Sequence, residues 1–144
     1  MLLEASMKAV LVGVDGSDGS RRAAELAKVL ADAAGVSLSV IHVVEPLPDS
    51  TARALGFSLE DVHDRRLREG QRILDEMCDD LGVGQAGRVL EAGRAAETIC
   101  AAAAELGADH IVVGAHGHGP YRRLPGAVGS RLLNMASGTL TVVR

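Results

Sequence analysis

The sequence contains very few aromatic residues: among 144 residues there is no Trp, one Tyr and one Phe. Two aromatic rings provide no platform on which bases could stack, and a net charge of -4 also disfavours a nucleic-acid partner. No apolar run approaches the roughly 18 residues that would indicate a membrane span. The first six residues, MLLEAS, are too short and too acidic for a signal peptide. We therefore expect a disordered leader over residues 1–6 and a cytoplasmic protein that binds neither nucleic acid nor membrane.

Cysteine is also scarce, and the common phosphate-binding motifs are missing. The two cysteines, Cys78 and Cys100, fall inside helical patterns without CxxC spacing, which predicts reduced packing residues. The chain has no GxxxxGK[ST] motif, and no GxGxxG follows the first predicted strand. A P-loop and a dinucleotide fingerprint are therefore both excluded.

Short valine-rich runs alternate with helical patterns along the whole chain. The runs predict strands over residues 8–14, 37–44, 88–92, 109–113 and 139–143. Because helices separate them, we expect parallel βαβ units with helices on both faces of the sheet. Ser17 or Ser20 is expected to cap the first helix and Ser58 a later one, whereas residues 45–57, with two prolines, are expected to form a loop. The sequence thus predicts one doubly wound α/β domain over residues 1–144.

The most informative segment follows the fourth predicted strand, where residues 114–130 include five glycines. Glycines allow main-chain N–H groups to converge on an anion, and a following helix would add its free donors. Residues 110–144 also hold four arginines and no Asp or Glu, which suits an anionic ligand. The segment therefore predicts a phosphate cradle at the carboxyl ends of the strands. A tight glycine turn without a ligand, on a tail that happens to lack acids, is the alternative.

Four segments together resemble the universal stress protein family over nearly the full length of the chain. They are VGVDGS (residues 12–17), IHVVE (residues 41–45), ADHIVVGAHGHGP (residues 108–120) and the terminal TLTVVR. The resemblance implies a flavodoxin- or Rossmann-like sheet of strand order 3-2-1-4-5. It also implies a homodimer formed through the last strand, Thr139 to Val143, and a site for ATP, with or without Mg²⁺.

Family members that bind ATP use a motif of Gly, two residues, Gly, nine residues, then Gly-Ser or Gly-Thr. Gly114 and Gly117 match its first half. Asp15 matches the acid that approaches the ribose and any bound metal, and Val43 matches the residue whose main chain contacts the adenine, with Val14 beside it. The implied nucleotide-binding set is Val14, Asp15, Val43, Val113, Gly114, His116, Gly117, His118, Gly126, Ala127, Gly129 and Ser130.

The second half of the motif departs from the family pattern. Eight residues separate Gly117 from Gly126, and eleven separate Gly117 from Gly129. Counting back from the last strand places Gly126-Ala127 at the motif, which loses the hydroxyl, whereas Gly129-Ser130 keeps it. A helix starting near Gly126 would run to about Met135, but one starting at Ser130 would have under two turns. The helix lengths favour Gly126 as the second glycine of the motif. One consequence is that nucleotide binding is weakened or lost.

Three histidines and Asp15 have competing interpretations. His116 and His118 could contact phosphate, but no third ligand at a recognisable spacing supports a metal site. His42 lies inside a predicted strand and is expected to be a hydrogen-bonded structural residue. Asp15 could instead cap the helix or hold its own turn.

No nucleophile, base and orienting group occur together in the sequence, so we predict a binding protein and not an enzyme. The predicted function is a stress-response regulator that binds adenine nucleotide as a homodimer. One alternative is an interaction module that has lost nucleotide binding. Another is a slow ATPase that uses Asp15.

Overall fold

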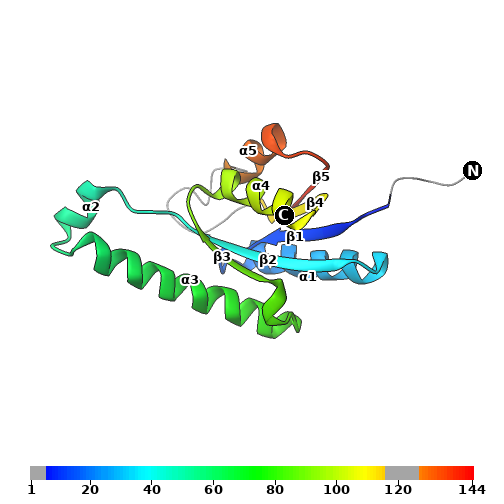
Figure 1. The fold of residues 1–144 in the computed structure, drawn as a ribbon, viewed down its shortest axis with the longest axis horizontal. Coiled ribbons are helices and arrows are strands. Elements are labelled where there is room, and N and C mark those ends of the chain that lie inside the picture. Colours follow the sequence, from blue (N-terminus) through cyan, green and yellow to red (C-terminus); the bar gives the residue numbers. More distant parts are fainter. Residues whose placement is uncertain (1–5, 116–126) are drawn as a thin grey trace, which may run out of the picture.

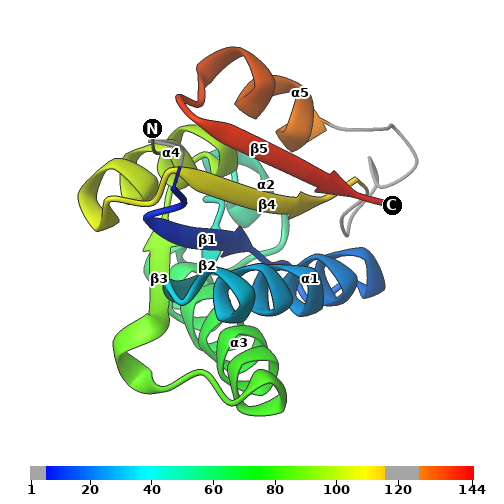
Figure 2. The same ribbon diagram turned by 90° about the vertical axis from the view of Figure 1, so that its right-hand side faces the viewer.

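A computed structural model describes residues 6–115 and 127–144. Within these residues, five parallel strands form one sheet of order β3-β2-β1-β4-β5 (Figure 2). The strands are β1 (Ala9–Gly13), β2 (Ser37–Val44), β3 (Arg88–Ala92), β4 (His110–Gly114) and β5 (Thr139–Val143). The helices are α1 (Asp18–Ala34), α2 (Asp49–Ala54), α3 (Leu59–Leu81), α4 (Ala95–Leu106) and α5 (Ala127–Met135), with a 3₁₀ turn, η1 (Gln85–Gly87). The predicted fold class and strand order are confirmed.

Helices cover both faces of the sheet, and each face has its own core (Figure 1). Because successive residues of a strand point to opposite faces, Val10 and Val12 of β1 pack towards α1 and α3, whereas Leu11 packs towards α4 and α5. Alanines on α1 allow that helix to approach the sheet closely, and Leu132 of α5 is fully buried on the other face. Nearly continuous apolar strands are typical of a parallel sheet that is buried on both sides.

The helix ends follow the capping signals of the sequence. Ser17 is the N-cap of α1, where its side chain accepts a hydrogen bond from the Ser20 N–H group. Ser58 caps α3 in the same way by accepting from the Asp61 N–H group. Gly35 ends α1 in the left-handed conformation, which glycine adopts without a steric penalty. Of the two serines expected to cap α1, Ser17 does so.

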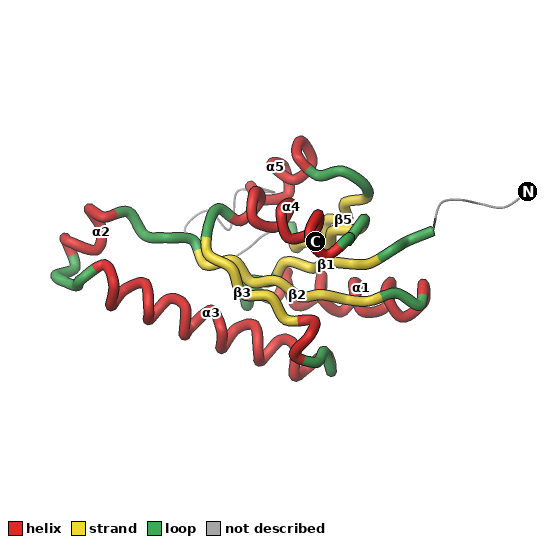
Figure 3. Tube along the Cα trace, viewed as in Figure 1, coloured by secondary structure: helices red, strands yellow, loops and turns green. Residues whose placement is uncertain are grey.

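The loop expected over residues 45–57 is wrong in its middle part, where the structure has α2. Pro48 is the N-cap of α2, and its carbonyl group accepts hydrogen bonds from the Thr51 and Ala52 N–H groups. Both prolines precede the helix, so neither interrupts its hydrogen bonds. Ala52 is fully buried, and α2 packs on α3 beyond the end of the sheet (Figure 3). Tertiary packing thus stabilises a helix too short to form alone.

A glycine lets α3 lie close to the sheet. Gly70 is buried in the interior of this helix, and a Cβ atom there would lie 2.7 Å from Cγ2 of Val44 and 3.0 Å from Cδ2 of His42. Both distances are shorter than a normal van der Waals contact. The missing side chain therefore sets how closely α3 approaches β2.

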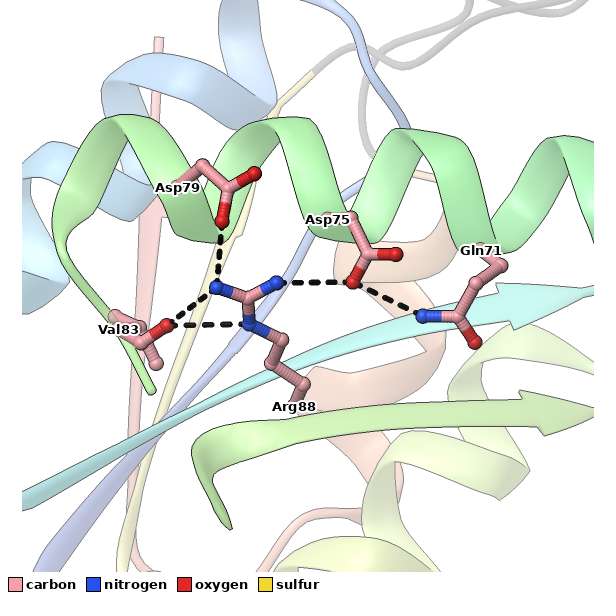
Figure 4. A network of polar contacts seen from close by, with 5 residues as sticks. All are labelled: Gln71, Asp75, Asp79, Val83 and Arg88. Carbon is pink, nitrogen blue, oxygen red and sulfur yellow. Dashed lines mark hydrogen bonds and ion pairs between the residues drawn. The ribbon is translucent and has the colours of Figure 1, made fainter. Parts of the chain in front are cut away.

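An arginine joins the start of β3 to α3 (Figure 4). The Arg88 guanidinium donates to the Val83 carbonyl oxygen, to Asp75 Oδ1 at 3.0 Å and to Asp79 Oδ1 at 2.7 Å. Gln71 also donates to Asp75 Oδ1, at 3.1 Å. The Arg88 side chain is only 10% exposed, so water is partly excluded from these bonds. The network joins the edge strand β3 to helix α3.

Candidate functional site

The strand order reverses between β1 and β4. From β1 the chain passes to β2 and β3 on one side of the sheet, and it later returns to β4 and β5 on the other. In doubly wound sheets, ligands bind beyond the carboxyl ends of the strands at such a reversal. Here the turn after β1 and the segment after β4 leave the sheet at that point. These two segments define the candidate site.

The turn after β1 is held by its own side chains. Asp15 Oδ1 accepts hydrogen bonds from the Ser17 N–H group, at 2.9 Å, and from the Ser17 hydroxyl group. The Asp15 N–H group donates to Ser20 Oγ at 3.2 Å. Asp15 therefore holds its own turn, as one interpretation of this residue predicts, whereas the N-cap of α1 is Ser17. Its half-buried carboxylate lies directly before the N-terminus of α1, where the helix dipole favours a negative charge.

Two hydrogen bonds to β2 fix the main chain of Val14. Its N–H group donates to the Ile41 carbonyl oxygen at 2.9 Å, and its carbonyl oxygen lies 2.7 Å from His42 Nδ1. The expectation that His42 is hydrogen-bonded is confirmed. Its partner could not be predicted, because the bond joins residues 28 positions apart.

The three valines of the predicted site contribute their side chains to the core. Val14 packs in the core that faces α1 and α3, and Val113 packs in the opposite core with the half-buried Val43 beside it. Val43 lies opposite Glu91 in the β2–β3 ladder. A ligand at this edge of the sheet would therefore meet mainly main-chain atoms of these residues.

Gly114 is where β4 meets the first turn of α1. A Cβ atom on Gly114 would lie 2.8 Å from the carbonyl carbon of Gly19 and 3.1 Å from the Ser20 nitrogen. Main-chain atoms cannot move aside as a flexible side chain can, so this position requires glycine for packing. From the sequence, Gly114 was assigned only to phosphate binding. In the structure, Gly114 also packs directly on the main chain of Gly19 and Ser20, so the segment after β4 starts in contact with the segment after β1.

Helix α5 begins at Ala127 and ends at Met135, as the helix-length comparison predicted. Gly129 therefore lies within its first turn, where a Cβ atom would be 3.6 Å from Val142 Cγ2. Ser130 is exposed, and its carbonyl oxygen accepts from Asn134 Nδ2 at 3.3 Å. The remaining predicted site residues, His116, Gly117, His118 and Gly126, lie outside the described residues.

One carboxylate near the carboxyl ends of the strands, that of Glu45, was not among the site residues predicted from the sequence. Glu45 follows β2, and its Oε1 atom accepts a hydrogen bond from the Ala95 N–H group, at 3.1 Å, in the first turn of α4. The side chain of the helix N-cap, Arg94, makes no capping bond. An acid directly after a strand was the available signal, but its partner lies 50 residues away.

The cysteines are free thiols that pack against neighbouring helices and strands. Cys78 is buried and Cys100 is partly buried. Burial raises the pKa of Cys78 to about 11 and also raises the pKa of Cys100, so both are protonated at neutral pH. Their expected role as reduced packing residues agrees with these surroundings. Within residues 6–115 and 127–144, no group of three or more His, Cys, Asp or Glu could hold a metal ion.

A parallel sheet with helices on both faces, whose strand order reverses between β1 and β4, defines a doubly wound α/β protein with Rossmann-like topology. The chain belongs to the universal stress protein family, whose model matches residues 7–144. No helix in the part of the chain that the structure describes is long and apolar enough to cross a membrane.

Individual relatives agree with this family. The chain is 38% identical, over 130 residues, to the universal stress protein in the QAH/OAS sulfhydrylase 3' region of Thermus aquaticus, covering 90% of this chain and 88% of that protein. Its fold matches the universal stress protein UspA of Lactobacillus plantarum with a TM-score of 0.79 at 22% identity, covering 98% of this chain and all of that one. A universal stress protein solved in complex with cAMP matches with a TM-score of 0.64 at 23% identity, covering 97% and 98% of the two chains.

Proposed function

We propose that this protein binds an adenine nucleotide, with ATP as the first candidate, and acts as a cytoplasmic stress-response regulator. The observation that carries the proposal is the contact of Gly114 with the first turn of α1. It brings the Asp15 turn and the start of the glycine-rich segment together at the strand reversal. Membership of a family with a cAMP-bound member supports the same ligand class.

Under this proposal, the phosphates bind main-chain N–H groups of the glycine-rich segment, and His116, Gly117 and His118 are the candidate contacts. The N-terminus of α5, from Ala127, would add free N–H donors and the positive end of its dipole. A glycine is needed at Gly117 because a side chain there would obstruct the approach of phosphate to the main chain.

The nucleoside would lie over the ends of β1 and β2. The adenine would lie against the main chain of Val14 and Val43, and the Asp15 carboxylate would approach the ribose. Asp15 is also the carboxylate that would bind the Mg²⁺ ion accompanying ATP, since Mg²⁺ is usually held by phosphates and one or two carboxylates. Such an ion would neutralise part of the phosphate charge.

Mass spectrometry of the denatured, purified protein tests the proposal by detecting co-purified ATP, ADP, AMP or cAMP. Calorimetry with ATP should show binding that Gly117→Val abolishes. Gly84→Val is the matched control, because a Cβ atom at Gly84 meets nothing within 4 Å and its φ of -72° suits any residue. Equal ATP affinity for the unaltered chain and Gly117→Val would refute the assignment of the phosphate site.

A second candidate function is an interaction module that has abandoned nucleotide. The start of α5 favours it, because a helix beginning at Ala127 places alanine where ATP-binding members have Ser or Thr. Absence of co-purified nucleotide, together with no heat of ATP binding, would select this candidate. Slow ATP turnover with labelled ATP would instead indicate an ATPase, and the rate should then fall in Asp15→Ala.

We also propose that the protein is a homodimer formed through β5. This edge strand is short and apolar, and its Val142 side chain is 44% exposed. Such an edge invites pairing with another strand. Sedimentation at micromolar concentration should therefore detect a dimer, whereas a monomer at all concentrations would refute this part of the proposal.

A further inference from the structure

A histidine from β2 holds the peptide group that precedes the Asp15 side chain. The Val14 carbonyl oxygen lies 2.7 Å from His42 Nδ1, and the N–H group of the same planar peptide unit, on Asp15, donates to Ser20 Oγ at 3.2 Å. One peptide plane is thus held at both ends. We infer that His42 is a positioning residue for the nucleotide, and that it acts by fixing this peptide and with it the Asp15 carboxylate. The inference rests on the proposed function.

The effect of His42 extends through the whole turn. Once the Val14–Asp15 peptide is fixed, Asp15 Oδ1 can accept from the Ser17 N–H group at 2.9 Å. Ser17 Oγ in turn accepts from the Ser20 N–H group at 3.1 Å. Rotation of that peptide would redirect the Asp15 carboxylate and loosen the N-cap of α1. The hydrogen bond from His42 to the Val14 carbonyl oxygen should therefore affect the whole turn.

The geometry also assigns the tautomer of His42. A carbonyl oxygen can only accept a hydrogen bond, so Nδ1 must carry the proton. In the neutral ring, Nε2 is then the unprotonated nitrogen. An Asn side chain at this position can bring an amide nitrogen close to the place of Nδ1, whereas the amide nitrogen of Gln reaches the place of Nε2. This difference distinguishes a specific donor from a side chain that only fills space.

Helix α3 holds the imidazole ring in place. The missing Cβ atom of Gly70 would lie 3.0 Å from His42 Cδ2, so the ring packs directly against the helix main chain at that residue. Leu90 of β3 lies beside the same glycine, with its Cδ1 atom 3.2 Å from that Cβ position. The ring therefore has little freedom to leave the Val14 carbonyl group. The packing of α3 on the sheet is in this way linked to the Asp15 turn.

Amide hydrogen exchange, followed by NMR on the full chain without nucleotide, tests the inference. After correction for any change in global stability, exchange of the Asp15, Ser17 and Ser20 amides should be about tenfold faster in His42→Leu than in the unaltered chain. Loss of one hydrogen bond has an effect of about this size. His42→Asn should restore slow exchange, and His42→Gln should not. Imidazole ¹⁵N shifts of the unaltered chain should show the Nδ1–H tautomer.

His110→Leu is the matched control. His110 is also a hydrogen-bonded strand histidine, with its Nε2 atom 2.7 Å from Thr141 Oγ1. It is buried, whereas His42 is half-buried, and it starts β4 at the opposite end of the sheet. Its loss should lower global stability without a specific effect on the Asp15 turn. An equal effect of both leucine variants on the turn would mean that His42 acts only through general packing, and would overturn the inference.

Calorimetry with ATP then connects the turn to the ligand. The affinity should fall about tenfold in His42→Leu and recover in His42→Asn, with His110→Leu close to the unaltered chain. Unchanged exchange in His42→Leu, or an Nε2–H tautomer, refutes the positioning role even if ATP binds. Absence of ATP binding by the unaltered chain refutes the proposed function and the nucleotide part of the inference. The exchange data would still show whether His42 fixes the turn.

Discussion

Replacing Gly70 by alanine sets two effects of known direction against each other. In a helix interior, alanine is favoured over glycine by about 1 kcal/mol. At Gly70, however, the added Cβ atom would lie 2.7 Å from Val44 Cγ2, 3.0 Å from His42 Cδ2 and 3.2 Å from Leu90 Cδ1. Valine has a stiff χ1 angle and cannot easily turn its methyl group away. Overpacking of this kind typically costs about 1–3 kcal/mol.

We therefore expect Gly70→Ala to lower the free energy of unfolding by about 1 kcal/mol, the overpacking cost less the helix preference. Gly84→Ala is the control, because a Cβ atom there meets nothing within 4 Å and its φ is -72°. By restricting the unfolded chain, that change should raise the free energy of unfolding by about 0.4–1 kcal/mol. The two variants should thus change stability in opposite directions.

Urea unfolding followed by far-ultraviolet circular dichroism measures both variants, since a chain without Trp gives little fluorescence signal. In thermal scans, each kcal/mol corresponds to a shift of about 2–4 °C for a domain of this size. If Gly70→Ala is as stable as Gly84→Ala, or more stable, then α3 does not lie close enough to the sheet for a Cβ atom at Gly70 to be crowded. The His42 ring would then not be held by the main chain of α3.

Three further predictions concern other parts of the molecule. Gly138→Ala should destabilise by about 3 kcal/mol or more, because φ is +92° and a Cβ atom would lie 2.5 Å from the Asp109 carbonyl oxygen. Gly107→Ala, with φ of +66° and open space, should cost only about 1 kcal/mol in the same urea titration. Hydrogen bonds from main-chain N–H groups, first that of Lys8 and then that of Ala9, lower the pKa of Asp109. Its contribution to stability is therefore present above the unfolded pKa of about 3.9 and is lost as pH falls through the lower folded value. Asp109→Asn should flatten the acid limb of a stability–pH curve, and an unchanged limb would contradict this. Finally, a thiol reagent at pH 8 should modify Cys100 before Cys78, whose pKa of about 11 leaves it protonated until the chain unfolds. Equal rates for the two thiols in the native protein would refute their assigned burial.

The sequence was sufficient for the order of strands and helices because those signals are local. Valine-rich runs, capping serines and terminal glycines each act within a few residues of their position. Helix α2 was not predicted because its stability comes from packing on α3, where Ala52 is buried, and not from a local sequence signal. Two prolines nearby suggested a loop, although both precede the helix.

The candidate site could be located from the sequence, but its internal bonds could not. Asp15 and Gly114 were identified from motif matches, and both lie at the strand reversal in the structure. The bond from His42 to the Val14 carbonyl group and the bond from Glu45 to α4 join segments 28 and 50 residues apart. Pairings at such separations depend on strand order and register, which become known only when the fold is known.

The Arg88 network makes the two borders of the sheet unequal. On one border, β3 is locked under α3 by ion pairs to two carboxylates. On the other border, β5 carries an exposed valine and has no comparable lock among the described residues. If copies associate by adding strand to strand, we expect β5 to be the border that accepts the neighbour. Self-association of this type would then close as a symmetric pair and could not continue into a filament.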